Sequence, residues 1–143
     1  MQATRTLNGI LFRTEEGRYD LDASAQWIGQ DLLVSIWGGE RPHIGAVALA
    51  QPRPSLRDPG RTGATASVLC VVGHKEDEVV KKASEHLSSV FKTRVVVTAG
   101  IHWDNLDGEG IGLVLRNIDL LTEYIVQYLE EDLNVPDEER GKV

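Results

Sequence analysis

The segment "HKEDEVVKKASEHLSSVFKTRVVVTAGI", residues 74–101, decides the fold class because its apolar residues change from helical spacing to a continuous run typical of a strand. Its first part has apolar residues at helical spacing, and acidic residues in the first turn complement the positive end of a helix dipole. This pattern predicts a helix that begins near His74. The apolar run "RVVVTAGI" at its end is typical of a strand buried on both faces. A helix is therefore followed directly by a core strand.

Strands are expected before this segment, and a second helix after it. The turns between the N-terminal runs favour an antiparallel meander, followed by one strand buried on both faces. An apolar stripe over residues 111–128 predicts a long amphipathic helix that starts at Asp107 or an adjacent glycine and ends before Pro136. The strands before residue 74 are predicted at residues 4–14, 17–29, 31–39, 43–51 and 65–72.

These elements indicate an α+β domain with a mostly antiparallel sheet of about six strands and two helices on one face. We expect a single domain over residues 1–135 and a polar C-terminal tail over residues 136–143. A sheet covered on one side leaves its other face to be explained. Self-association into a homodimer is the expected answer.

The segment "PRPSLRDPGRTG", residues 52–63, is expected to be a loop because it holds three prolines, two glycines and three arginines. Two interpretations remain open for it. It is either a surface connection or an arginine-bearing lid over a bound anion.

Composition excludes several classes of protein. The net charge of −7 at pH 7 argues against nucleic acid as a partner. No apolar stretch approaches the roughly 20 residues that span a bilayer, and the N-terminus lacks the apolar core of a signal peptide. We therefore expect a cytoplasmic protein with no membrane partner. Cys70 is the one cysteine, and in the apolar run "ASVLCVV" it is expected to act as a small hydrophobe.

Three of the four histidines lie at predicted strand ends beside glycine. His43 occurs in "GGERPHIG", His74 in "VVGHKED" and His102 in "AGIHWDN". Glycine permits close approach of another group to the backbone, so these strand ends suit a ligand site. Either the three histidines share one small-molecule site, or each makes local hydrogen bonds at its own turn.

The chemistry of such a site stays open at this level. Three imidazoles with Asp104 would supply enough ligands for a metal, but the histidines are about 30 residues apart and lack a recognisable metal-binding spacing. No nucleophile motif is present. Lys75 at a helix N-terminus suits an anion or phosphate, although the acidic residues after it compete for the same field. Trp37 and Trp103 are candidates for covering an aromatic ring.

Three motifs, in order and spacing, resemble the LpdD-like family of prenylated-flavin chaperones, the small partners of gallate decarboxylase-type enzymes. They are "GGERPHIGAVALA", "SVLCVVGHKEDEVV" and "VVVTAGIHWDNL", with a helix after the last. The resemblance covers about residues 5 to 130. It implies a dimeric α+β fold like that of proteasome-assembly chaperones, with no catalytic activity.

The resemblance also implies a ligand and partners. Such a protein would bind reduced prenylated FMN, made by a flavin prenyltransferase, and pass it to an apo-decarboxylase of the UbiD type. No catalytic residue and no metal ligand is implied. Two alternatives remain: a small metal-dependent or acid-base enzyme that uses the histidine cluster, and an assembly chaperone without a ligand. The cofactor-binding residues implied by the resemblance are His43, Gly45, His74, Lys75, His102 and Asp104.

Overall fold

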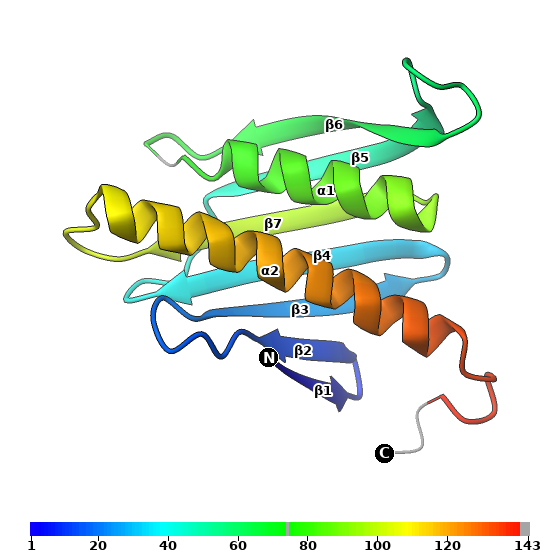
Figure 1. Cartoon of the computed structure of the whole chain (residues 1–143), viewed down its shortest axis with the longest axis horizontal. Helices are drawn as coiled ribbons and strands as arrows, with labels where there is room; N and C mark the ends of the chain where they lie inside the picture. Colours follow the sequence, from blue (N-terminus) through cyan, green and yellow to red (C-terminus); the bar gives the residue numbers. More distant parts are fainter. Residues whose placement is uncertain (74, 141–143) are drawn as a thin grey trace.

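The structure is a computed structural model, and it describes residues 1–73 and 75–140. One continuous sheet carries both helices on the same face (Figure 1). No helix in these two ranges is long and apolar enough to cross a membrane. The elements are β1 (Gln2–Thr6), β2 (Gly9–Arg13), β3 (Leu21–Ile28), β4 (Asp31–Gly39), β5 (Ala46–Pro54), β6 (Thr62–Cys70), α1 (Asp77–Phe91), β7 (Val95–His102) and α2 (Gly108–Leu133).

The predicted α+β class is confirmed, with seven strands in place of about six. The predicted run at residues 4–14 contains two strands, β1 and β2, which pair across a turn between Thr6 and Gly9. Helix α1 begins at Asp77, three residues later than expected, and α2 begins after Asp107 as its pattern predicts. The Asp107 side chain accepts a hydrogen bond from the N–H of Gly110 at 2.7 Å, which caps α2.

The strand order is β1-β2-β3-β4-β7-β5-β6, so the predicted meander is wrong at its fourth strand. β5 does not lie beside β4, because β7 occupies the place between them. β7 pairs parallel with β4 and antiparallel with β5. A strand with apolar residues on both faces is best accommodated at the centre of a sheet. The valines of β7 therefore lie at the centre of the sheet, although β7 is the last strand in the sequence.

The loop predicted at residues 52–63 is shorter in the structure. β5 continues to Pro54 and pairs there with Thr62, so the two strands form a long hairpin around residues 55–61. β5 pairs with β7 only from Ala46 to Ala50, which leaves its later residues with one unpaired edge. Proline is tolerated at such an edge because no partner strand needs its missing N–H.

β6 was expected to be buried on both faces, and that prediction is wrong. It is an edge strand that pairs only with β5. Cys70 is exposed, as are Leu69 and Val72, at 79% and 97% of their surfaces. The apolar run at residues 65–72 does not reveal that the strand lies at an edge. Helix α1 packs against one face of β6, and β5 pairs with one of its two edges.

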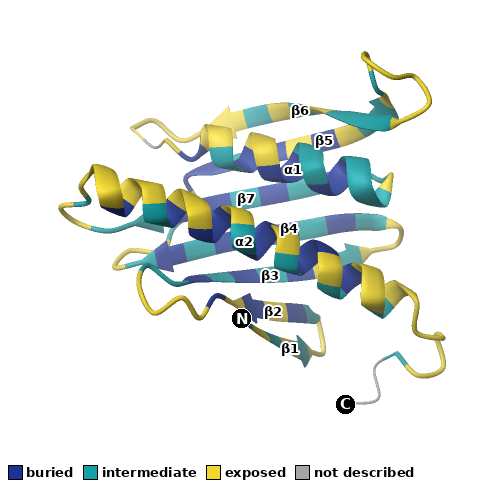
Figure 2. Cartoon of the chain, in the orientation of Figure 1, coloured by how far each residue is buried: buried dark blue, intermediate teal, exposed yellow. Residues whose placement is uncertain are grey.

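The core lies between the sheet and the two helices, and Figure 2 shows where the buried residues lie along the strands and helices. In β5 the alternate residues Ala46, Ala48 and Ala50 are fully buried, and their small side chains leave room for α1. The predicted stripe of α2 supplies Ile118, Leu121 and other apolar residues to the same core. Each helix therefore buries one stripe and exposes the other.

The opposite face of the sheet is covered by neither α1 nor α2 (Figure 1). Side chains that alternate with the buried ones form two neighbouring rows across β4, β7, β5 and β6. None of these side chains is charged. We call these eight residues the open-face patch: Leu33, Val96, Leu49 and Ser67 in one row, and Ser35, Thr98, Val47 and Leu69 in the other.

Candidate functional site

Helices α1 and α2 begin at the same end of the sheet, where β4 and β7 end (Figure 1). A pocket of about 270 Å³ lies there, between the first turns of α1, the first half of α2 and the end of β7. We call it the helix-end pocket. Most of its lining is apolar, and its polar side chains are those of His43, Lys75, Glu76 and His102. It therefore combines a mostly apolar lining with four ionisable side chains, of which Lys75 and His102 lie at the exposed rim.

The structure brings several of the predicted residues together. His43, Lys75 and His102 all line the helix-end pocket, although they come from three different segments. Asp104 lies beside His102, with 2.9 Å between its Oδ1 and the imidazole Nε2. Gly45 lies behind the pocket wall, as described below. His74 lies outside the described residues.

His43 is held by a buried carboxylate that sequence reasoning did not assign to the site. Its Nε2 lies 2.9 Å from Oε1 of Glu76, whose side chain is 11% exposed. Its Nδ1 lies 2.8 Å from the carbonyl oxygen of Arg41. A carbonyl oxygen only accepts hydrogen bonds, so Nδ1 carries a proton. Glu76 also accepts the N–H of Ile101 at 3.3 Å. These contacts fix the imidazole against the end of β7.

Two glycines make this arrangement possible. A Cβ on Gly100 would lie 1.6 Å from the carbonyl oxygen of His43, so only glycine lets the His43 segment rest on β7. A Cβ on Gly45 would lie 2.3 Å from Oε2 of Glu76. The space beside Gly45 is thus filled by the Glu76 carboxylate. Both glycines admit another part of the protein at the strand end.

The second pair, His102 with Asp104, is more exposed. Asp104 also accepts a hydrogen bond from the Arg41 guanidinium at 2.9 Å, and its backbone N–H donates to Glu40 at 2.9 Å. The hydrogen bond with His102 and then the one from Arg41 hold the pKa of Asp104 below its usual value. Arg41 thus touches both pairs, through its carbonyl oxygen at His43 and its guanidinium at Asp104.

Sequence reasoning missed Glu40, Arg41 and Glu76. The first two precede His43 in the quoted motif "GGERPHIG", so their proximity to the site was available as a signal. For Glu76, one of the acidic residues at the start of the predicted helix, the sequence pattern indicates only an interaction with the helix dipole. Nothing in the local sequence indicates that its carboxylate turns toward His43, because that contact depends on β5 and α1 meeting at the end of β7.

The two candidate tryptophans are separated by the sheet. Trp103 lines the helix-end pocket and packs edge-to-face on Tyr19, with 5.1 Å between ring centroids. Trp37 alternates with the buried Ile36 along β4 and so lies on the face without helices. Only Trp103 is placed to cover a ligand in the pocket.

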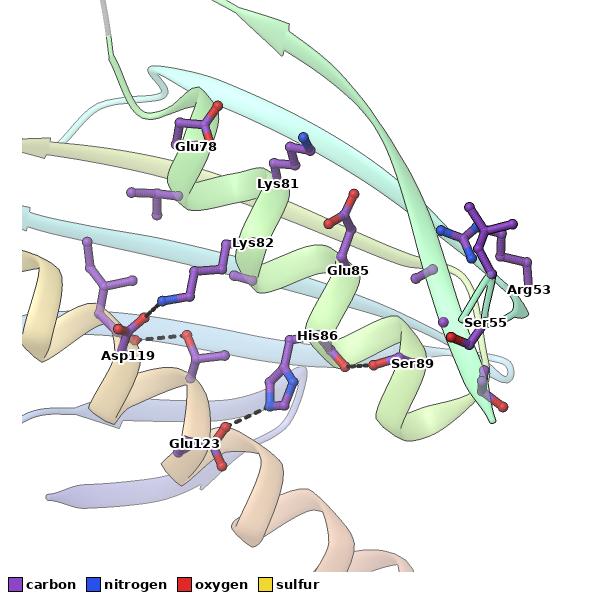
Figure 3. Close-up of a pocket in the computed structure, with 18 of the residues that line it drawn as sticks. Arg53, Ser55, Glu78, Lys81, Lys82, Glu85, His86, Ser89, Asp119 and Glu123 are labelled. Atoms are coloured by element: carbon purple, nitrogen blue, oxygen red, sulfur yellow. Dashed lines mark hydrogen bonds and ion pairs between the residues drawn. The ribbon is translucent and has the colours of Figure 1, made fainter. Parts of the chain in front are cut away.

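A larger cavity of about 1200 Å³ is a groove over α1, between the β5–β6 hairpin and α2 (Figure 3). Two pairs of its charged side chains contact each other: Lys82 and Asp119 at 2.7 Å, and His86 and Glu123 at 2.7 Å. The arginine-bearing loop at residues 55–61 lies at the opposite end of the sheet from the helix-end pocket (Figure 1). It does not form a lid over the histidines, so we place the candidate site in the smaller pocket.

Imidazoles and carboxylates are also the side chains that bind metal ions. Within residues 1–73 and 75–140, no group of three or more histidine, cysteine, aspartate or glutamate side chains is arranged to hold a metal ion. The described imidazoles at the pocket instead lie in two separate pairs with carboxylates.

Two comparisons with known proteins agree on one family. The model of the prenylated flavin chaperone LpdD-like domain matches residues 15–130. Protein LpdD of Lactiplantibacillus plantarum is 28% identical over 122 residues, which cover 83% of this chain and 84% of that protein. Among solved structures, a chain from a chaperone complex for yeast 20S proteasome assembly is similar, with a TM-score of 0.47 and 14% identity. That match covers 80% of this chain and 94% of the other. Because the domain model spans most of its length, the chain belongs to the prenylated flavin chaperone LpdD-like family.

Proposed function

We propose that this protein is a non-catalytic carrier that binds reduced prenylated FMN in the helix-end pocket and delivers it to an apo-decarboxylase of the UbiD type in the cytoplasm. The observation that supports this most is the meeting of His43, Lys75 and His102 around one apolar pocket. Imidazole and ammonium groups donate to flavin carbonyls and phosphate, and apolar walls shield a ring from water. Membership of the LpdD-like family supports the choice of ligand. A flavin prenyltransferase would be the source of the ligand.

Each predicted residue has a distinct part in this proposal. Lys75 and His102 present donors at the rim, and Asp104 orients His102 through their 2.9 Å contact. His43 forms a fixed wall, and Gly45 admits the Glu76 carboxylate that holds it. His74 belongs to the proposed set by its position beside Lys75 in the sequence. Once delivered, the flavin would supply the decarboxylase with the reactive ring that its chemistry needs, while the carrier only holds and shields it.

The size of the pocket suits a carrier better than a permanent host. Its volume of about 270 Å³ lies below the range of about 300 to 1,000 Å³ typical of pockets that enclose a whole drug-sized ligand. A flavin nucleotide would therefore be held in part and remain accessible in part. Partial enclosure limits the affinity of the carrier for the flavin. Delivery requires limited affinity, because the flavin moves to the acceptor only if the acceptor binds it more tightly.

A homodimer is part of the proposal, and the open-face patch supports it. Its eight side chains are uncharged and adjoin one another across four strands. Leu49 and Leu69 within it are 41% and 79% exposed. Soluble monomers rarely leave a broad apolar surface uncovered, and a second copy would present the same uncharged surface. Size-exclusion chromatography with light scattering should give the mass of two chains, and Leu69→Lys should give the mass of one.

Anaerobic calorimetric titration of the protein with reduced prenylated FMN tests the carrier role. We expect saturable binding, weakened about three- to tenfold by His102→Ala because a donor to the ligand is lost. His86→Ala is the matched control, since His86 lies on α1 away from the pocket and pairs with Glu123. Failure of the wild-type protein to bind would overturn the function, and normal binding by His102→Ala would overturn the site.

Delivery needs its own measurement. Loaded carrier should activate an apo-decarboxylase of the UbiD type faster than the same concentration of unbound reduced prenylated FMN. Equal rates across several such enzymes would contradict delivery even if the flavin binds.

A second candidate is an acid-base enzyme, favoured by the two histidine–carboxylate pairs at one pocket. In that case His102 would donate or accept a proton in the reaction, and His102→Ala would abolish it. The same titration separates the two functions, because the enzyme has no need of reduced prenylated FMN.

A further inference from the structure

The helix-end pocket differs in chemistry between its depth and its rim, and this difference bears on how a ligand enters. The depth is formed mainly by aliphatic and aromatic side chains, with Ile101 at the end of β7, Trp103 just after it, and Val114 and Ile118 from α2; the buried Glu76 carboxylate adjoins them. Val114 and Ile118 are 7% and 5% exposed, so this part is nearly dry. The cationic side chain that lines the pocket, Lys75, is exposed at the rim.

Both helix N-termini at the pocket already have anionic side chains. Glu76 is the N-cap residue of α1, and its carboxylate lies against His43 and the N–H of Ile101. Asp107 is the N-cap of α2 and accepts a hydrogen bond from the N–H of Gly110. The positive ends of the two helix dipoles are thus offset by carboxylates of the protein itself.

A phosphate dianion is therefore poorly suited to the depth of the pocket. It would lose its hydration against apolar side chains and approach the Glu76 carboxylate, whose side chain is only 11% exposed. A flat apolar ring system would lose little hydration there and would displace water from apolar surface. The two ends of a prenylated flavin nucleotide thus have opposite preferences for depth and rim.

We propose that the protein holds its ligand with the prenylated ring edge inward and the phosphate outward at the rim; this orientation rests on the proposed function. Recognition then lies in the apolar edge of the modified flavin, and the phosphate adds only screened contacts with exposed cations such as Lys75. The outward phosphate is also the part that an acceptor protein meets first, so transfer begins at the phosphate and ends with withdrawal of the ring.

Removal of the phosphate tests this orientation directly. Reduced prenylated FMN and its dephosphorylated form, reduced prenylated riboflavin, are titrated anaerobically into the full-length protein by calorimetry. We expect dissociation constants within about tenfold of each other, because exposed ion pairs contribute little. A loss of more than about 100-fold without the phosphate would overturn the orientation while leaving the carrier function intact. If neither form binds, the proposed function fails and the orientation fails with it.

Variants of α2 give a second measurement with a matched control. Leu115 lines the pocket and is 50% exposed, so Leu115→Asn should fold normally. We expect this substitution to weaken the binding of both flavins by the same factor, about five- to tenfold, because apolar contact with the ring is lost. Leu133→Asn, at a 43% exposed position at the far end of α2, should bind as the wild type does. If Leu115→Asn leaves both affinities unchanged, the ring does not enter this pocket.

Discussion

The two histidine–carboxylate pairs at the helix-end pocket have the same parts in different surroundings. In each pair, an imidazole nitrogen lies 2.9 Å from a carboxylate oxygen. The side chains of His43 and Glu76 are 22% and 11% exposed, whereas those of His102 and Asp104 are 42% and 49% exposed. Charges interact strongly where water is excluded and weakly where it is not. The first pair therefore stabilises the wall of the pocket, and the second remains available to a ligand.

The largest effect is expected from the backbone contact that seats the buried pair. Gly100→Ala places a Cβ where the His43 carbonyl oxygen now lies, so the loop must leave β7. We expect the free energy of unfolding to fall by about 3 kcal/mol or more, measured by urea denaturation. Gly112→Ala is the control, since a Cβ there has nothing within 4 Å, and it should stabilise α2 slightly. Equal stability of the two variants would show that the loop is not held as described.

A smaller loss is expected from the buried carboxylate itself. Glu76→Gln keeps the shape of the side chain but removes the charge beside His43, and the free energy of unfolding should fall by about 1 to 3 kcal/mol. Glu78→Gln, at an exposed position two residues along the same helix end, should change it by less than about 0.5 kcal/mol. If the two substitutions have the same effect, burial does not distinguish the first pair.

The smallest effect on stability is expected at the exposed pair. Asp104→Asn should leave the free energy of unfolding unchanged within error, because water and salt screen its contacts. The pKa of Asp104 is lowered in the folded protein, so its small contribution is present above the usual aspartate pKa and is lost as pH falls through the lowered value.

Carboxyl NMR measures the pKa of Asp104 directly. His102→Ala and Arg41→Gln should each raise it toward the usual aspartate value, since the His102 hydrogen bond and then the hydrogen bond and charge of Arg41 lower it. An unchanged pKa in both variants would mean that the second pair is not formed in solution.

Much of the fold could be predicted from local patterns. The two helices, the core strand at residues 94–101 and the α+β class follow from hydrophobic period and composition, which are properties of short segments. The position of β7 between β4 and β5 could not be predicted, because it depends on pairing between residues that are distant in the chain. The exposure of Cys70 was missed for the same reason, since an apolar run does not reveal whether its strand lies at an edge.

The site shows the same division. The glycine-flanked strand ends leave open whether their histidines share one site or make local hydrogen bonds. In the structure His43 and His102 line one pocket, and each also contacts a residue two positions away. The pattern does not indicate what the glycines do. At Gly100 and Gly45 the approaching group is the protein's own backbone or carboxylate, and these contacts arise only when β5, α1 and β7 meet.

The central place of β7 also determines when the pocket forms during synthesis. Until residues 95–102 have left the ribosome, the chain can form the β1–β4 ribbon and, separately, the β5–β6 hairpin with α1. β4 and β5 then each lack the neighbouring strand that β7 later supplies. Closure by β7 requires contacts between residues distant in sequence, which form slowly and leave nascent chains prone to aggregation. His102 ends β7, and Gly100 within it supports the His43 loop. A nascent chain therefore lacks the helix-end pocket, which only the finished molecule contains.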